Sequence, residues 1–311
     1  MSEQSSTQTE MHLLVTGANG QLGQCLADRL NKQKIPHTLL SRQDADINDT
    51  VVLEKLVADK CVTAIINAAA YTAVDKAESE PELAKRVNED GPMALAKLCS
   101  RFDIPLLHVS TDYVFDGNKQ TPYVETDQTG PTGVYGQTKL NGEIAVQRHC
   151  RKHIILRTAW VFSEYGNNFL KTMLRLAKER DTLGVVGDQI GCPTYAGDIA
   201  EALISIAQQL HKAEQNKSGT KAHYGVYHYA GNEAVSWYGF AEAIFAVAQR
   251  AGILVTIPVL NEINTAAYPA PAKRPGYSVL SSAKIEADYN VRPSNWRAAC
   301  ERLSNGLLRK G

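Results

Sequence analysis

The chain has 311 residues, of which 44% are hydrophobic and 21% charged, as in an ordinary globular protein large enough to bury a substantial core. Lys and Arg total 33, as do Asp and Glu, so the charge balance predicts neither a nucleic acid nor a membrane surface as partner. No apolar run approaches the roughly 20 residues of a transmembrane helix.

The chain opens with a polar segment, residues 1–10, which predicts a disordered leader. Short apolar runs then alternate with amphipathic helical stretches such as Leu22–Asn31 and Asp90–Arg101. This alternation predicts βαβ units and an α/β fold with a doubly wound parallel sheet of the Rossmann type. The expected strands are His12–Thr16, His37–Leu40, Ala64–Ala68, Pro105–Ser110 and Ile154–Thr158.

The pattern loosens after Thr158 and predicts a smaller, mixed C-terminal substrate-binding domain. We expect a dinucleotide-binding domain over residues 11–158, with strand and helix returns near 197–230, and a mainly substrate-binding region over 159–311. Helices are expected from the cap Asn168 to Ala177, after Asp198, and from the cap Ser236 to just before Gly252. Surface loops are expected at Lys212–His223 and at the proline-rich Tyr268–Pro275.

A glycine-rich turn follows the first expected strand and reads Gly17-Ala18-Asn19-Gly20-Gln21-Leu22-Gly23. Glycines let the backbone approach a pyrophosphate closely, and the helix that follows offers unpaired N–H groups. A glycine set alone is weak evidence, but its place between a strand and a helix predicts a dinucleotide site. The residues assigned to it are Gly17, Asn19, Gly20, Gln21, Leu22 and Gly23.

The second expected strand ends in Ser41-Arg42, without the carboxylate that binds the ribose hydroxyls of NADH. Arg42 can pair with a 2′-phosphate and Ser41 can donate a hydroxyl, so the pair favours NADPH and leaves NADH as the alternative. The competing interpretation of Arg42 is a solvated surface side chain. Asp46 and Ile47, at the expected entry to the third strand, are assigned to the adenine.

Two further segments form a catalytic pattern. Tyr135 and Lys139 are four residues apart and share a helix face, and Thr111 stands at a strand end. A phenol has a pKa near 10, and a neighbouring ammonium is expected to lower it and to bind the nicotinamide ribose. Thr111 can hydrogen-bond the substrate oxygen. Although Tyr and Lys at this spacing are common in helices, the combination with the glycine turn predicts a reductase.

Longer motifs resemble the dTDP-4-dehydrorhamnose reductases, a group of extended short-chain dehydrogenases/reductases, from about Leu13 to about Trp296. The motifs are the glycine turn, Asn67-Ala68-Ala69-Ala70-Tyr71-Thr72-Ala73-Val74-Asp75, Ser110-Thr111-Asp112-Tyr113-Val114-Phe115-Asp116-Gly117, Tyr135-Gly136-Gln137-Thr138-Lys139, Arg157-Thr158-Ala159-Trp160, Asn167-Asn168-Phe169, Asp188-Gln189-Ile190-Gly191-Cys192-Pro193-Thr194 and Lys273-Arg274-Pro275.

The resemblance implies hydride transfer from NAD(P)H to the 4-keto group of dTDP-6-deoxy-L-lyxo-4-hexulose, giving dTDP-L-rhamnose for lipopolysaccharide O antigen or another surface polysaccharide. Tyr135 would protonate the alkoxide, with help from Thr111 and Lys139. It implies further cofactor contacts at Ala69, Ala70, Tyr71 and Thr72. The substrate contacts that it implies are Val74, Thr111, Asp112, Tyr113, Trp160, Asn168, Phe169, Asp188, Gln189 and Arg274, the last facing the diphosphate by charge.

One departure from the family concerns assembly. Members with metal-bridged dimers carry a glutamate two residues beyond the third glycine, where this chain has Cys25. We therefore expect no metal site, no magnesium bridge, and a monomer or weak homodimer. The six cysteines lack metal-ligand spacing, and Cys25, Cys61 and Cys99 lie in or beside apolar stretches, which predicts reduced core thiols and a cytoplasmic location.

Alternative functions share the same motifs. A dehydratase needs an Asp-Glu pair after the threonine, and this chain has Asp112-Tyr113, which disfavours elimination. An epimerase would retain its NAD through turnover. A non-catalytic subunit resembling the regulatory subunit of methionine adenosyltransferase is the rival from another class, and the intact set of Thr111, Tyr135 and Lys139 argues against it.

Overall fold

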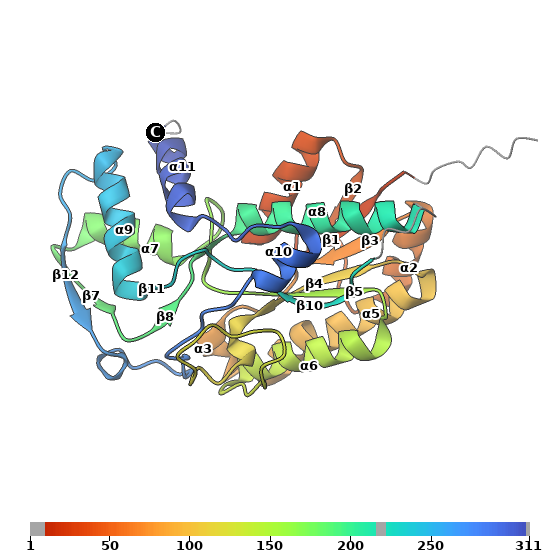
Figure 1. Ribbon diagram of the computed structural model, residues 1–311, viewed down its shortest axis with the longest axis horizontal. Coiled ribbons are helices and arrows are strands. Elements are labelled where there is room, and N and C mark those ends of the chain that lie inside the picture. The colour runs from red at the N-terminus through yellow and green to blue at the C-terminus, as the bar shows by residue number, and fades with distance from the viewer. Residues whose placement is uncertain (1–9, 216–221, 309–311) are drawn as a thin grey trace, which may run out of the picture.

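The computed structural model describes residues 10–215 and 222–308. Six parallel strands form its central sheet in the order β10-β5-β4-β3-β1-β2 (Figure 1). From β1 the chain winds outward in both directions, which confirms the predicted doubly wound parallel sheet. The strands are β1 Leu13–Thr16, β2 His37–Leu40, β3 Ala64–Asn67, β4 Leu106–Thr111, β5 His153–Thr158 and β10 Gly225–His228.

Helices cover both faces of this sheet (Figure 1). Successive strand residues point to opposite faces, so Leu13 and Val15 pack under α1 and α8, whereas Leu14 belongs to the core beneath α2, α5 and α6. These apolar side chains are fully buried on both sides of the sheet, as a parallel sheet requires. The helices are α1 Gln21–Gln33, α2 Thr50–Asp59, α5 Gly91–Phe102, α6 Val134–His149 and α8 Ala196–Gln215.

A second core lies beyond the carboxyl end of the sheet, at the left of Figure 1. Helices α7 Phe169–Glu179, α9 Trp237–Arg250 and α11 Trp296–Leu308 pack there with the parallel pair β7 Thr182–Val186 and β12 Val259–Ile263. Further elements are short: α3 Val74–Ala77, α4 Pro81–Lys85, a π-helical turn Arg86–Asp90, β6 Val161–Phe162, β8 Ile190–Gly191, β9 Thr194–Tyr195, β11 Val235–Ser236, and α10 Ala283–Tyr289. In the described segments, no helix is both long and apolar enough to cross a bilayer.

The two predicted helix caps are confirmed. Asn168 accepts a hydrogen bond from the Lys171 amide at 3.1 Å, and Ser236 accepts one from the Gly239 amide at 3.0 Å. The loop Tyr268–Pro275 also contains no helix or strand, as its prolines predict.

Three local predictions are wrong. Helix α8 continues through Lys212–Gln215, because its apolar face still reaches the core at Leu210, and residues 216–221 lie outside the described segments. Asp46 and Ile47 lie in a loop before α2, since the chain inserts that helix before the third strand, β3. Cys61 is exposed and has a φ of 49°, because it turns the chain out of α2, whereas Cys25 and Cys99 are buried. Of the predicted leader, only Glu10 is described, and it is exposed.

A buried ion pair fastens α6 to the sheet. The Arg157 guanidinium on β5 donates to both carboxylate oxygens of Glu143 on α6, at 2.9 and 2.7 Å. Glu143 is 0% exposed and Arg157 4% exposed. Removing one partner of such a pair leaves an uncompensated charge in the interior, which is strongly destabilising.

We predict that Arg157→Ala lowers the free energy of unfolding by about 3–5 kcal/mol, measured by urea denaturation. The matched control is Arg175→Ala, which breaks an exposed i,i+4 pair with Glu179 and should cost at most about 0.5 kcal/mol. Equal losses for the two variants would contradict this account of α6.

Candidate functional site

The glycine turn between β1 and α1 leaves no room for a Cβ at Gly17 or Gly23. Gly17 has a φ of 76°, and a Cβ there would lie 2.6 Å from the backbone nitrogen of Ala69. Gly20 caps α1 without any side-chain hydrogen bond, and the first turn of the helix carries no acidic residue. The unpaired N–H groups at this helix start are therefore available to an anion.

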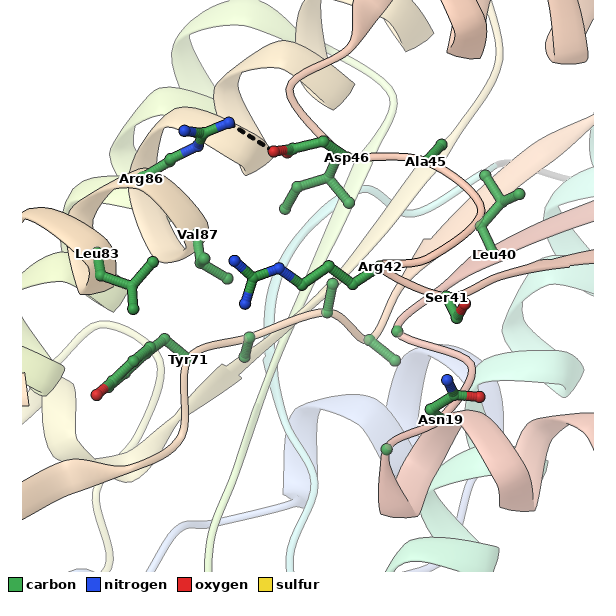
Figure 2. Close-up of a pocket in the computed structure, with 16 residues that line it drawn as sticks. Asn19, Leu40, Ser41, Arg42, Ala45, Asp46, Tyr71, Leu83, Arg86 and Val87 are labelled. Atoms are coloured by element: carbon green, nitrogen blue, oxygen red, sulfur yellow. Dashed lines mark hydrogen bonds and ion pairs between the residues drawn. The ribbon is translucent and has the colours of Figure 1, made fainter. Parts of the chain in front are cut away.

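A cavity of about 370 Å³ adjoins this turn (Figure 2). Figure 2 shows the Arg42 side chain extending into the cavity, with Tyr71 and Val87 nearby, while Arg86 pairs with Asp46 at 2.6 Å. The predicted cofactor residues that line the cavity are Gly17, Asn19, Gly20, Ser41, Arg42, Asp46, Ile47, Ala69, Ala70 and Tyr71. The remaining ones do not line it: Gln21, Leu22, Gly23, Thr72, Tyr135 and Lys139.

Sequence reasoning missed one wall of this cavity. Leu83, Arg86 and Val87 line it from α4 and the π-helical turn (Figure 2). Their spacing of three and four residues is a helical signal, but only the fold shows which strand ends that helix covers. An open helix start, a glycine turn and a guanidinium at the far end together fit a dinucleotide cofactor.

The predicted catalytic residues meet where β4 ends and α6 begins. The side chains of Tyr135 and Thr111 interact, and the Thr111 hydroxyl donates to Asp112 at 2.9 Å. The rings of Tyr113 and Tyr135 contact each other edge to face, with centroids 5.4 Å apart. Gly136 makes this approach possible, because any Cβ there would collide with the Tyr113 carbonyl oxygen.

Burial decides the charge states at this centre. It raises the pKa of Tyr135 to about 12, with the Thr111 side chain opposing that shift, and it raises the pKa of Asp112 to about 6. Tyr135 is therefore protonated at neutral pH. The expected lowering of its pKa by Lys139 is not found, because the Lys139 ammonium is directed to the Val109 carbonyl oxygen at 2.7 Å.

Lys139 is itself buried, 1% exposed, and burial lowers its pKa to about 8, with Glu143 opposing that shift. Its neighbour on the other side is the imidazole of His108, 3.5 Å from Nζ. His108 was not identified from the sequence, where a histidine in an apolar strand carries no distinguishing signal.

Asn88 is a second group that sequence reasoning missed. From the π-helical turn, its side-chain amide accepts from the Tyr71 amide at 2.8 Å and donates to the Tyr71 carbonyl at 3.1 Å and to Thr138 at 3.2 Å. It thereby ties the loop that lines the cavity to the helix that carries Tyr135. The π-helical insertion that aims Asn88 inward is of a kind frequent at functional sites.

The predicted aromatic substrate residues form one stack. The rings of Trp160 and Trp237 stack face to face, with centroids 3.5 Å apart and 6° between their planes. Phe169 contacts Trp237, with ring centroids 4.6 Å apart. Trp160 has a φ of 46°, a conformation that is costly for a bulky side chain and is found mostly at functional sites. Trp237, which completes the stack, has no sequence signal because it lies in another segment of the chain.

A second cavity, of about 610 Å³, lies beside this stack. Phe169, Gln189 and Arg274 line it among the predicted substrate residues, together with Trp237 and Tyr268. The other predicted substrate residues do not line it: Val74, Thr111, Asp112, Tyr113, Trp160, Asn168 and Asp188.

Several predicted substrate residues have partners within the chain. Arg274, expected to face a diphosphate, pairs with Asp75 at 2.8 Å, one residue beyond Val74, which begins α3. Asp188 accepts two hydrogen bonds from Thr265, at 2.9 and 2.7 Å, and so holds the turn that borders the second cavity.

Gln21 and Asn168 were assigned to different ligands, and the structure brings them together. The Asn168 amide donates to Gln21 Oε1 at 2.9 Å, and Ser163 donates to the same oxygen at 2.9 Å. The start of α1 and the start of α7 are thus held to each other, so the cofactor side and the substrate side of the site are mechanically joined.

Known proteins similar to this chain share this architecture. The model of the family described as "RmlD substrate binding domain" matches residues 11–308. A dTDP-4-dehydrorhamnose reductase of Aggregatibacter actinomycetemcomitans is 48% identical over 294 residues, which are 94% of this chain and 97% of that protein. A crystal structure of such a reductase from Clostridium acetobutylicum superposes with a TM-score of 0.85 at 36% identity, covering 96% of this chain and all, 100%, of that one.

A second solved structure, the dTDP-4-dehydrorhamnose reductase of Bacillus anthracis in complex with NADP, has a TM-score of 0.85 at 33% identity and covers 95% of this chain and 99% of that one. Both identity and coverage are far above what fold similarity alone would produce. The chain therefore belongs to the dTDP-4-dehydrorhamnose reductase family.

Proposed function

We propose that this protein uses NADPH to reduce the 4-keto group of dTDP-4-dehydro-L-rhamnose, giving dTDP-L-rhamnose. Membership of the family supports this substrate, since its relatives carry that name. The observation that carries the mechanism is the pair of Tyr135 and Thr111: a phenol that keeps its proton at neutral pH, next to a hydroxyl at the carboxyl end of β4. Ligands of such folds bind at that edge of the sheet.

The bound nicotinamide cofactor supplies the hydride that the carbonyl carbon accepts. As negative charge develops on the carbonyl oxygen, Tyr135 donates its proton to that oxygen, and the Thr111 hydroxyl orients the acid. Asp112 accepts the Thr111 hydrogen bond and so fixes the direction of the hydroxyl. Lys139 would bind the nicotinamide ribose through its ammonium group.

The two cavities divide the ligands between two parts of the chain. We assign residues 11–158 mainly to the cofactor, with Arg42 facing the 2′-phosphate, and residues 159–311 mainly to the sugar nucleotide. The second cavity suits that substrate because it combines aromatic rings, including Phe169 and Trp237, with the guanidinium of Arg274.

The direct test is to incubate the protein with dTDP-glucose, the two enzymes that convert it to the 4-keto sugar, and NADPH. The expected result is loss of NADPH absorbance and formation of dTDP-L-rhamnose. No NADPH oxidation with a verified keto-sugar would favour the non-catalytic subunit, and a tightly bound NAD recycled through turnover would favour an epimerase.

The first prediction from the proposed function concerns the acid. Tyr135→Phe removes the proton donor but keeps the ring, so kcat should fall by about 10²–10⁴-fold while cofactor binding changes little. Lys139→Met should impair both turnover and cofactor binding, and Thr111→Val should be milder than Tyr135→Phe because the proton donor remains. The matched control is Tyr224→Phe, which removes a hydroxyl that donates to Glu214 on the protein surface. This variant should keep normal turnover. Near-normal kcat in Tyr135→Phe would place the acid elsewhere.

The second prediction concerns the choice of cofactor. Arg42→Ala should weaken NADPH roughly ten- to a hundredfold more than NADH, because a hydrogen bond to a charged group contributes about 1.5–3 kcal/mol. Titration calorimetry with both cofactors measures this ratio. The matched control is Arg86→Ala. The Arg86 guanidinium lines the same cavity but is already paired with Asp46, so its loss should change the NADPH-to-NADH ratio less. Equal weakening of both cofactors by Arg42→Ala would refute this role.

The third prediction concerns assembly. Cys25, at the position of the glutamate in metal-bridged members, is fully buried, and burial raises the pKa of its thiol to about 12, so it offers no charged ligand. The elution volume in size-exclusion chromatography should be the same with magnesium and with a chelator. A shift from dimer to monomer on chelation would show that other residues bridge the subunits through a metal.

A further inference from the structure

A row of buried polar side chains crosses the sheet and ends at Lys139. Thr16 on β1 donates to Asn67 Oδ1 on β3 at 2.7 Å, Asn67 Nδ2 lies 3.0 Å from His108 Nδ1 on β4, and His108 Nε2 lies 3.5 Å from Lys139 Nζ. Thr16, Asn67 and His108 are 0% exposed. Such a row in the middle of an otherwise apolar sheet is costly unless every group is satisfied.

The direction of each hydrogen bond follows from one backbone group. The Ala69 amide lies 3.1 Å from Asn67 Oδ1, and since an amide N–H can only donate, that atom must be the oxygen. The nitrogen of the same side chain must then face His108 and donate to Nδ1. Because Nδ1 accepts, the single proton of the neutral imidazole is on Nε2, which points to Lys139.

An Nε2–H group can only donate to its neighbour, and an ammonium has no lone pair with which to accept. A neutral Lys139 amine can satisfy both contacts: it accepts from His108 and donates to the Val109 carbonyl at 2.7 Å. We propose that His108 is a positioning residue that, through a tautomer set by Ala69 and Asn67, stabilises the neutral amine of Lys139 and thereby sets the pH above which the enzyme loses its lysine charge.

The surroundings of Lys139 agree with this role. Burial lowers its pKa to about 8, and the opposing charge is Glu143, one turn further along α6, which is engaged by Arg157 from β5. Burial and the neighbouring lysine charge hold the pKa of His108 well below its usual value, so the imidazole remains neutral when Lys139 titrates. Lys139 is therefore charged below about pH 8 and neutral above it.

The consequence for activity rests on the proposed function, in which the charged lysine binds the nicotinamide ribose. The rate should then fall on the alkaline side as Lys139 loses its proton. If the hydrogen bond from His108 is removed, the Lys139 ammonium should keep its proton up to a higher pH. The alkaline limb of the pH profile should therefore move to higher pH.

Two substitutions of His108 separate its two contacts. His108→Asn keeps an acceptor where Nδ1 meets Asn67 but does not reach Lys139, whereas His108→Gln places an amide donor near the position of Nε2. We expect the pKa of Lys139 to rise by about one unit in His108→Asn, the effect of one hydrogen bond, and to remain near the wild-type value in His108→Gln. The first readout is an NMR titration of ¹³C-lysine-labelled full-length protein, with Lys139→Met used to assign the resonance.

The second readout is the pH profile of kcat/KM with the keto-sugar and NADPH. Its alkaline limb should lie at higher pH in His108→Asn than in the wild type, and near the wild-type position in His108→Gln. Long-range ¹⁵N–¹H spectra of the wild type should show His108 protonated on Nε2, assigned by its loss in His108→Asn. Thermal unfolding of both variants checks that the fold is retained.

The inference is overturned if His108 carries its proton on Nδ1, or if Lys139 titrates alike in wild type and a folded His108→Asn variant. These NMR results stand without any turnover, so they remain decisive if the keto-sugar is not a substrate. Conversely, normal reduction by the wild type together with an unchanged alkaline limb in His108→Asn would remove the role of His108 and leave the proposed function in place.

Discussion

The close approach of α6 to the carboxyl end of β4 is the constraint on which the site depends. Glycine at position 136 lets the helix approach the Tyr113 backbone, and Gly142 lets it approach the Asn88 carbonyl, where a Cβ would collide. The buried pair of Glu143 and Arg157 holds the helix at that distance. Tyr135 and Lys139 can therefore be placed on the sheet edge without themselves providing the packing energy.

The same desolvation acts in opposite directions on the two groups that α6 carries. It raises the pKa of the Tyr135 phenol and lowers that of the Lys139 ammonium, because in each case it favours the neutral form. A neutral phenol is what protonation of an alkoxide requires. The lysine stays charged at neutral pH by a small margin only, so its polar neighbours have a large influence on its state.

The doubly wound sheet was predictable because its signal is local: apolar runs alternate with helical patterns, and the turn at Gly17 lies between a strand and a helix. The pair of Tyr135 and Lys139, to which we assign the chemistry, could be picked out because the two residues are four positions apart on one helix. His108, Asn88 and Trp237 were not, since each acquires meaning only from a partner 17 or more residues away, such as Tyr71 for Asn88.

At the cofactor end of the site, the contacts of Asp44 change the interpretation of the Ser41-Arg42 pattern. The sequence pattern Ser41-Arg42 suggests that both side chains serve a 2′-phosphate. In the structure, the Ser41 hydroxyl and its backbone amide both donate to the Asp44 carboxylate, at 2.6 and 2.8 Å, and these bonds lower the pKa of Asp44 and keep it charged. The Ser41 proton is thus already committed to an anion.

In the proposed function, Arg42 then attracts the 2′-phosphate in the presence of the charged Asp44 carboxylate. Its guanidinium extends into the cavity (Figure 2), while the other arginine there, Arg86, is engaged by Asp46. The proposed discrimination between the two nicotinamide cofactors therefore rests on the Arg42 guanidinium rather than on Ser41 and Arg42 together. Because the Asp44 carboxylate opposes the binding of a phosphate, the proposed preference should respond to substitution of Asp44 as well as of Arg42.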